Sequence, residues 1–256
     1  MIEIGLLDSK LEKGEKDNLD LIISNIEELS DEEKEYISES LVEISQGRDS
    51  FYSIQTISKK INSFLKKQDT KTVNGAISEF ILVCLLRKNN FSQEYCFRNL
   101  EENSIKKGFD GLYLKNDIVW LAESKSTATL NQHKNSHKHT IDLGYKGLCN
   151  QISGKTTNDP WENAVSHTIA AKSERTLISQ LTKLSEDYMD NKYVEIEQQN
   201  IILGSTIITS KINDIEKNKN EIEKLLDKHK VNQELVVIIN LTTNELFLDF
   251  FKEVSK

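Results

Sequence analysis

The chain has 256 residues, of which 37% are hydrophobic and 29% charged. These proportions are typical of a globular protein. The length allows one large domain, or one domain with an appendage. No run of eighteen apolar residues occurs, and the first residues lack the features of a signal peptide, so we expect no membrane partner. The three scattered cysteines fit reduced thiols, and we therefore expect a cytoplasmic protein.

The formal net charge of −8 is unevenly distributed along the chain. Residues 1–50 carry fifteen acids and five bases, a net charge of −10, which leaves +2 for the remainder. Between Lys125 and Lys155, five lysines accompany a single acid, Asp142. We therefore expect the body of the protein to accept nucleic acid, and the N-terminal region not to.

Residues 1–70 are predicted to form an acidic, mainly helical N-terminal region. Leu19–Leu29 has apolar residues at helical spacing, and the capping box Ser30-Asp-Glu-Glu33 opens a helix to about Ser45. A further helix is expected over Ser50–Lys67. This acidic layer could serve packing and solubility, which is the simpler interpretation, or could bind a partner.

Residues 71–256 are predicted to form an α/β domain with a mixed sheet flanked by helices. Thr72 is expected to cap a helix from Val73 to about Lys88, and Tyr95–Leu100 is expected to be the first strand. The β-branched runs 201–209 and 234–241 alternate with an expected helix over 212–230, which is typical of a parallel crossover. A helix over 161–191, interrupted near residue 173, precedes this crossover, and residues 246–251 close the chain as helix or strand.

A β-hairpin is predicted over residues 109–125. Phe109–Lys115 and Ile118–Lys125 are rich in aromatic and β-branched residues, and Asn116-Asp117 tolerates the positive φ angles of a two-residue turn. Counting outward from this turn places Asp110 opposite Glu123.

The outer end of this hairpin carries two carboxylates and an amine on one face. Asp110 and Glu123 would repel each other by up to about 1 kcal/mol, and a hard divalent cation such as Mg²⁺ or Mn²⁺ would offset that repulsion. Lys125, on the same face, could orient a water molecule or stabilise charge on a phosphate. The residues therefore outline a phosphodiesterase site, although the same pattern would fit a surface hairpin that faces solvent.

Asp110 followed by Glu123-Ser124-Lys125 resembles the D…ExK signature of the PD-(D/E)xK nuclease superfamily. The helix beginning Gly75-Ala-Ile-Ser-Glu79 supplies a further acid ahead of the first strand, where Glu79 could alternatively be a solvated helix residue. Together with Gly108-Phe-Asp-Gly111, the pattern is similar to the HamA-like family of anti-phage nucleases. The similarity covers roughly residues 73–125, and no proline precedes Asp110, a position that the superfamily keeps loosely.

The resemblance implies a PD-(D/E)xK restriction-endonuclease-like domain over residues 71–256. It implies metal-dependent hydrolysis of DNA, with Asp110, Glu123 and Glu79 as ligands of Mg²⁺ or Mn²⁺ and Lys125 as a catalytic residue. It also implies the effector nuclease of a Hachiman anti-phage system, whose partners are DNA and a HamB-like helicase/ATPase. Two alternatives stay open: a stand-alone restriction-type endonuclease, and a non-catalytic nucleic-acid-binding subunit that retains the fold.

The polar stretch 126–155 contains three histidines, which could indicate zinc or a helix and loop that face phosphate. The sequence offers no nearby cysteine or acid to complete a tetrahedral zinc site, so contact with the nucleic-acid backbone is the better interpretation. The residues expected to make it are Lys134, His137, Lys138, Lys146 and Gln151. Gln151 could also point toward the active site.

Overall fold

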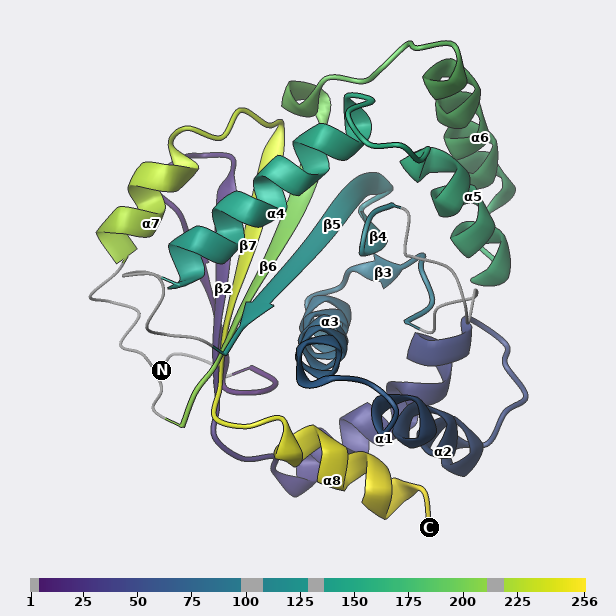
Figure 1. Cartoon of the computed structure of the whole chain (residues 1–256), viewed down its shortest axis with the longest axis vertical. Helices are drawn as coiled ribbons and strands as arrows, with labels where there is room; N and C mark the ends of the chain where they lie inside the picture. Colours follow the sequence, from purple (N-terminus) through teal and green to yellow (C-terminus); the bar gives the residue numbers. More distant parts are fainter. Residues whose placement is uncertain (1–4, 98–107, 129–135, 211–218) are drawn as a thin grey trace.

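The computed structural model describes residues 5–97, 108–128, 136–210 and 219–256. In these ranges a seven-stranded mixed sheet has helices on both faces (Figure 1). In sheet order the strands are β1 (Ser9–Lys13), β2 (Leu19–Ile26), β7 (Gln233–Leu241), β6 (Asn200–Ile208), β5 (Ile118–Thr127), β4 (Gly111–Lys115) and β3 (Ser92–Gln93). The helices are α1 (Asp31–Gln46), α2 (Ile54–Leu65), α3 (Thr70–Lys88), α4 (Ser136–Ile152), α5 (Pro160–Ala170), α6 (Arg175–Met189), the short 3₁₀ helix η2 (Ile196–Gln198), α7 (Lys219–Leu226) and α8 (Glu245–Val254).

The centre of the sheet is parallel, and its two edges are antiparallel. Strands β2, β7, β6 and β5 run parallel to one another, whereas β1 pairs antiparallel with β2, β4 with β5, and β3 with β4. Successive residues of β6 and β7 are buried on alternate faces: Ile202 and Val237 pack in one core, and Leu203 and Val236 in the other. Burial on both faces explains why these strands are continuous apolar runs in the sequence.

Each face of the sheet has its own hydrophobic core. Helices α1, α2, α3 and α8 cover one face, and α4, α5, α6 and α7 cover the other (Figure 1). Phe80 of α3 lies at the centre of the first core, where its ring packs edge-on against Phe97, Phe247 and Phe251 at centroid distances of 5.3, 6.1 and 5.2 Å. Helix α3 is therefore held firmly against the sheet, which fixes the position of the residues it presents. No helix of the described chain is both long and apolar enough to cross a membrane.

Several predicted helix features are confirmed. The Ser30 capping box forms, with the Glu33 N–H donating to Ser30 Oγ at 3.2 Å and the Ser30 N–H donating to the Glu33 carboxylate at 2.8 Å. The break near Ser173 separates α5 from α6, and the closing segment is the helix α8. Helix α3 begins three residues earlier than predicted, because Asp69 rather than Thr72 caps it.

The prediction of a helix at Leu19–Leu29 is wrong, because residues 19–26 form strand β2. This strand pairs with β7 and is buried on both faces, and such an apolar run also fits helical spacing. The β-branched Ile22 and Ile23 were the signal for a strand. The N-terminal region is thus joined to the main sheet through β1 and β2, and is not a purely helical layer.

The prediction of a strand at Tyr95–Leu100 is also wrong for the part that the structure describes. The strand β3 lies earlier, at Ser92–Gln93, and residues 98–100 lie outside the described ranges. The chain turns away because the Gln93 side chain donates to the carbonyls of Ile44 and Tyr95, and the Phe97 N–H donates to the Ile44 carbonyl at 2.8 Å. Of the helix predicted over 212–230, the structure describes α7 at 219–226, whereas residues 211–218 lie outside the described ranges.

Candidate active site

The predicted hairpin is confirmed together with its register. Asn116 and Asp117 form the turn with φ angles of 51° and 60°, in the left-handed region that a two-residue hairpin loop requires. The paired residues are Lys115 with Ile118, Leu114 with Val119, Tyr113 with Trp120, Leu112 with Leu121, and Gly111 with Ala122. Continuing this register brings Asp110 and Glu123 to the same end of the hairpin.

Asp110, Glu123 and Lys125 lie together at that end. The Asp110 N–H donates to the Ala122 carbonyl at 3.1 Å, and Asp110 Oδ2 accepts from the Ser124 N–H at 2.8 Å. Lys125 Nζ lies 2.5 Å from Glu123 Oε1 and 3.8 Å from Asp110 Oδ2. One lysine therefore contacts both carboxylates above the aliphatic floor of the hairpin.

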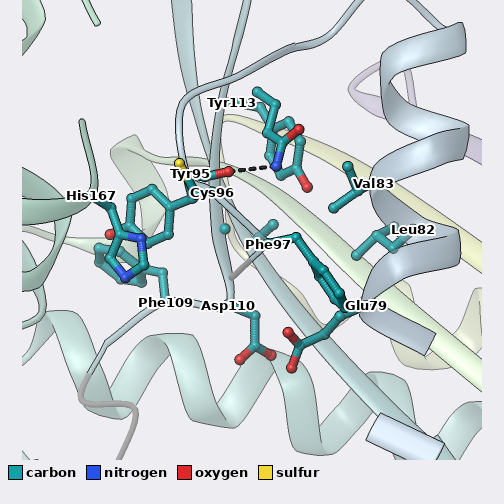
Figure 2. Close-up of a pocket in the computed structure, with 13 residues that line it drawn as sticks. Glu79, Leu82, Val83, Tyr95, Cys96, Phe97, Phe109, Asp110, Tyr113 and His167 are labelled. Carbon is teal, nitrogen blue, oxygen red and sulfur yellow. Dashed lines mark hydrogen bonds between the residues drawn. The ribbon is translucent and has the colours of Figure 1, made fainter. Parts of the chain in front are cut away.

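Glu79 approaches the same place from helix α3. It lines a hollow with Leu82 and Val83 of α3 and with Asp110. Figure 2 shows the carboxylates of Glu79 and Asp110 pointing to the same end of this hollow. Glu79 is half-buried, and its negative charge is one of those that raise the pKa of Lys125. The helix glutamate therefore belongs to the same acidic cluster.

Helix α4 packs closely over Glu123. A Cβ atom at Gly147 would lie 3.3 Å from Glu123 Oε1, and one at Gly144 would lie 3.8 Å from Glu123 Cγ. Gln151, one turn further along α4, donates from Nε2 to Glu123 Oε2 at 3.5 Å. Gln151 was predicted to point toward the active site, whereas Gly144 and Gly147 were not, although their i, i+3 spacing was an available signal.

The pKa values of Glu123 and Lys125 both differ from their usual values in this cluster. Burial raises the pKa of Glu123 and the charge of Asp110 raises it further, whereas Lys125 opposes them, and the result is about 7. Burial alone would lower the pKa of Lys125, but the charges of Glu123 and Asp110 outweigh it and hold that pKa above its usual value. The negative charges of Glu123 and Asp110 would therefore stabilise a cation that binds at this cluster.

The donor set suits Mg²⁺ or Mn²⁺, which prefer carboxylate oxygens. Among the described residues, no group of three histidine, cysteine or acidic side chains is arranged to hold a metal ion. Magnesium does not need three such ligands, because it commonly binds through one or two carboxylates and keeps several waters. Asp110 and Glu123 supply two carboxylates on one face.

Of the residues expected to hold a nucleic-acid backbone, Gln151 reaches this site through Glu123, whereas the others have different surroundings or are not described. Lys134 lies outside the described residues. Lys138 pairs with Glu221 at 3.8 Å, and Lys146 with Asp142 at 2.6 Å. His137 is buried, with Nδ1 2.7 Å from Ser205 Oγ and Nε2 3.0 Å from Asn240 Oδ1, and burial lowers its pKa to about 4. A buried neutral histidine anchors α4 to the sheet and does not present a surface for phosphate.

The fold and this site define an α/β protein with a cluster of carboxylates around one lysine at the end of a hairpin. The hairpin and α3 supply the carboxylates, and α4 covers them. The chain belongs to the HamA family, whose sequence model matches residues 3–254. No curated protein matches the chain. The family match spans both the site and the N-terminal strands β1 and β2.

Proposed function

We propose that this protein is a Mg²⁺- or Mn²⁺-dependent nuclease that hydrolyses DNA phosphodiester bonds. Asp110 and Glu123 would hold the cation, and Glu79 would complete the acidic cluster. The observation that carries the proposal is the buried Glu123 carboxylate, placed beside Asp110 with its pKa raised to about 7. Like charges held together in a buried place are costly unless a cation accompanies them, and the single lysine only partly offsets that cost.

Each residue of the candidate site would have its own role in this reaction. A divalent cation supplies charge neutralisation on the phosphoryl group and acidifies a water molecule. The Lys125 side chain is one-third exposed and its Nζ is held by Glu123, so it can donate a hydrogen bond to a phosphate oxygen or to the attacking water. Gln151 and the glycines of α4 restrict the movement of Glu123 and cover it from solvent. Hydrolysis then adds water to phosphorus as the bond to the leaving sugar oxygen breaks.

Membership of the HamA family supports a role for this nuclease in Hachiman anti-phage defence. We infer that the chain is the effector nuclease of such a system and that it acts with a helicase partner. A non-catalytic subunit of the same fold would bind DNA equally well with and without Mg²⁺, which separates the two interpretations experimentally.

Metal binding by the purified chain tests the proposal. Isothermal titration with Mn²⁺ should detect binding to the wild type that Asp110→Asn abolishes. Asp117→Asn is the matched control, because it makes the same chemical change at the exposed turn of the same hairpin. Equal Mn²⁺ binding by Asp110→Asn and the wild type would refute the assignment of the site.

A further inference from the structure

The connection between α2 and α3 carries a concentration of positive charge. Between Asp49 and Glu79 the sequence contains a single acid, Asp69, and five lysines, at positions 59, 60, 66, 67 and 71. Three of these, which we call the α2–α3 lysines, are Lys66, Lys67 and Lys71, and all three are exposed. This basic segment follows directly after the acidic residues 1–50.

The absence of ion pairs sets the α2–α3 lysines apart from several other surface lysines of the described chain. Lys172 has Asp49 as a partner at 3.6 Å, and Lys183 has Asp187 at 3.1 Å. Lys138 and Lys146 of α4 are also paired. Within the described ranges, no carboxylate lies at ion-pair distance from an α2–α3 lysine. Asp69, the one acid of this segment, interacts electrostatically with Lys71, and the remaining positive charge of the α2–α3 lysines is available to a polyanion.

Helix α3 links these lysines to the active site. Lys71, Gly75 and Glu79 are four residues apart, so they lie on one stripe of the helix, with about 6 Å between successive members. Leu82 continues the stripe and lines the same hollow as Glu79. The stripe therefore leads from an exposed lysine to the acidic cluster in slightly more than two helical turns.

Gly75 leaves a gap in the middle of this stripe. A Cβ atom at Gly75 would meet no atom within 4 Å, so no neighbouring side chain requires glycine there. Glycine is among the least favourable residues in the interior of a helix. Glycine is commonly found where a ligand approaches the backbone closely.

We propose that the nucleic-acid strand reaches the active site along the amino-terminal half of α3, with its phosphates held by Lys66, Lys67 and Lys71 and its backbone passing over Gly75 to Glu79. This rests on the proposed nuclease function and deepens it, because it assigns the substrate path. It also moves the principal phosphate contacts from α4, where Lys138 and Lys146 are paired with acids, to the α2–α3 connection.

The first test compares two triple variants that change the net charge equally. Lys66→Ala/Lys67→Ala/Lys71→Ala removes the α2–α3 lysines, and Lys172→Ala/Lys183→Ala/Lys192→Ala removes three exposed lysines that have acid partners. Binding of a fluorescent DNA duplex is measured by anisotropy in EDTA, which prevents metal-dependent cleavage, over a range of salt concentrations. The first variant should bind about tenfold more weakly or worse, with a salt slope lower by about 2–3, since each phosphate contact contributes about 0.9.

The second test places a side chain in the path. Gly75→Leu should lower DNA cleavage at least tenfold, whereas the rise in Tm on adding Mn²⁺ should be that of the wild type. Unchanged cleavage by Gly75→Leu would overturn the path over α3. Equal DNA binding by the two triple variants would overturn the role of the α2–α3 lysines.

Further outcomes separate this inference from the proposed function. If the wild type cleaves DNA but the two triple variants bind DNA equally well, the nuclease function is supported and the substrate path over α3 is refuted. A wild type that binds DNA through the α2–α3 lysines but cleaves nothing with any divalent cation supports the path and refutes the nuclease. Loss of binding to poly-glutamate without loss of binding to DNA would assign the α2–α3 lysines to an acidic protein segment and overturn the inference.

Discussion

Replacing Glu123 with glutamine should stabilise the metal-free protein more at pH 8 than at pH 5. Burial and the charge of Asp110 raise the pKa of Glu123 in the folded protein to about 7, whereas its ordinary value is 4.5. A carboxyl group that binds its proton more tightly when folded contributes stability at low pH. That contribution is lost as the pH rises from about 4.5 to about 7. Glutamine does not titrate and has no such dependence.

The size of the effect follows from the shift in pKa. One pKa unit corresponds to about 1.4 kcal/mol, and between pH 5 and pH 8 the ionisation of Glu123 removes about 2–3 kcal/mol of stability. For a chain of this size that is a change in Tm of roughly 5–10 °C. Comparing the difference between variant and wild type at two pH values removes any constant effect of the substitution on packing.

Thermal unfolding in EDTA at the two pH values measures this difference. Glu39→Gln, at an exposed position of α1, is the control and should show no comparable change between the two pH values. The reasoning is refuted if the difference in Tm between Glu123→Gln and the wild type is the same at pH 5 and pH 8, because Glu123 would then be ionised throughout.

Three further predictions concern metal affinity and local stability. The affinity for Mn²⁺ should fall about fivefold between pH 7 and pH 6, because Glu123 must lose its proton to bind the ion; calorimetric titration measures this, and a constant affinity would contradict it. Ser30→Ala should lower the free energy of unfolding by about 1 kcal/mol through loss of the capping box, as measured with urea; no change would mean that the box does not stabilise α1. Gly75→Ala should raise the free energy of unfolding by up to about 1 kcal/mol, because alanine is the better helix former and its Cβ meets nothing; a loss of stability would show a packing role that the structure does not contain.

The candidate site was predictable because its parts are local in the sequence. The turn residues Asn116 and Asp117 set the register, and the alternation of side chains along a strand then placed Asp110, Glu123 and Lys125 on one face. None of these steps requires knowledge of the rest of the fold. Glu79 was found through its place in a pattern, and the packing of α3 then brought it to the hairpin.

The features that failed or were missed depend on contacts that are distant in the sequence. The strand β2 is paired with β7, more than two hundred residues away, and its own apolar run fits either a helix or a strand. His137 looked like a surface residue until β6 and β7 supplied Ser205 and Asn240 as buried partners. In the same way, counting lysines could not show that Lys138 is paired, because its partner Glu221 belongs to another helix.

Cleavage of supercoiled plasmid by the purified chain tests the central claim most directly. Mg²⁺, Mn²⁺ and EDTA are compared side by side for the wild type, for Glu123→Gln and for the control Glu39→Gln. We expect nicking by the wild type and by Glu39→Gln that requires a divalent cation and is lost in Glu123→Gln. Cleavage that persists in Glu123→Gln or in EDTA, or no cleavage by the wild type with either cation, would contradict the account.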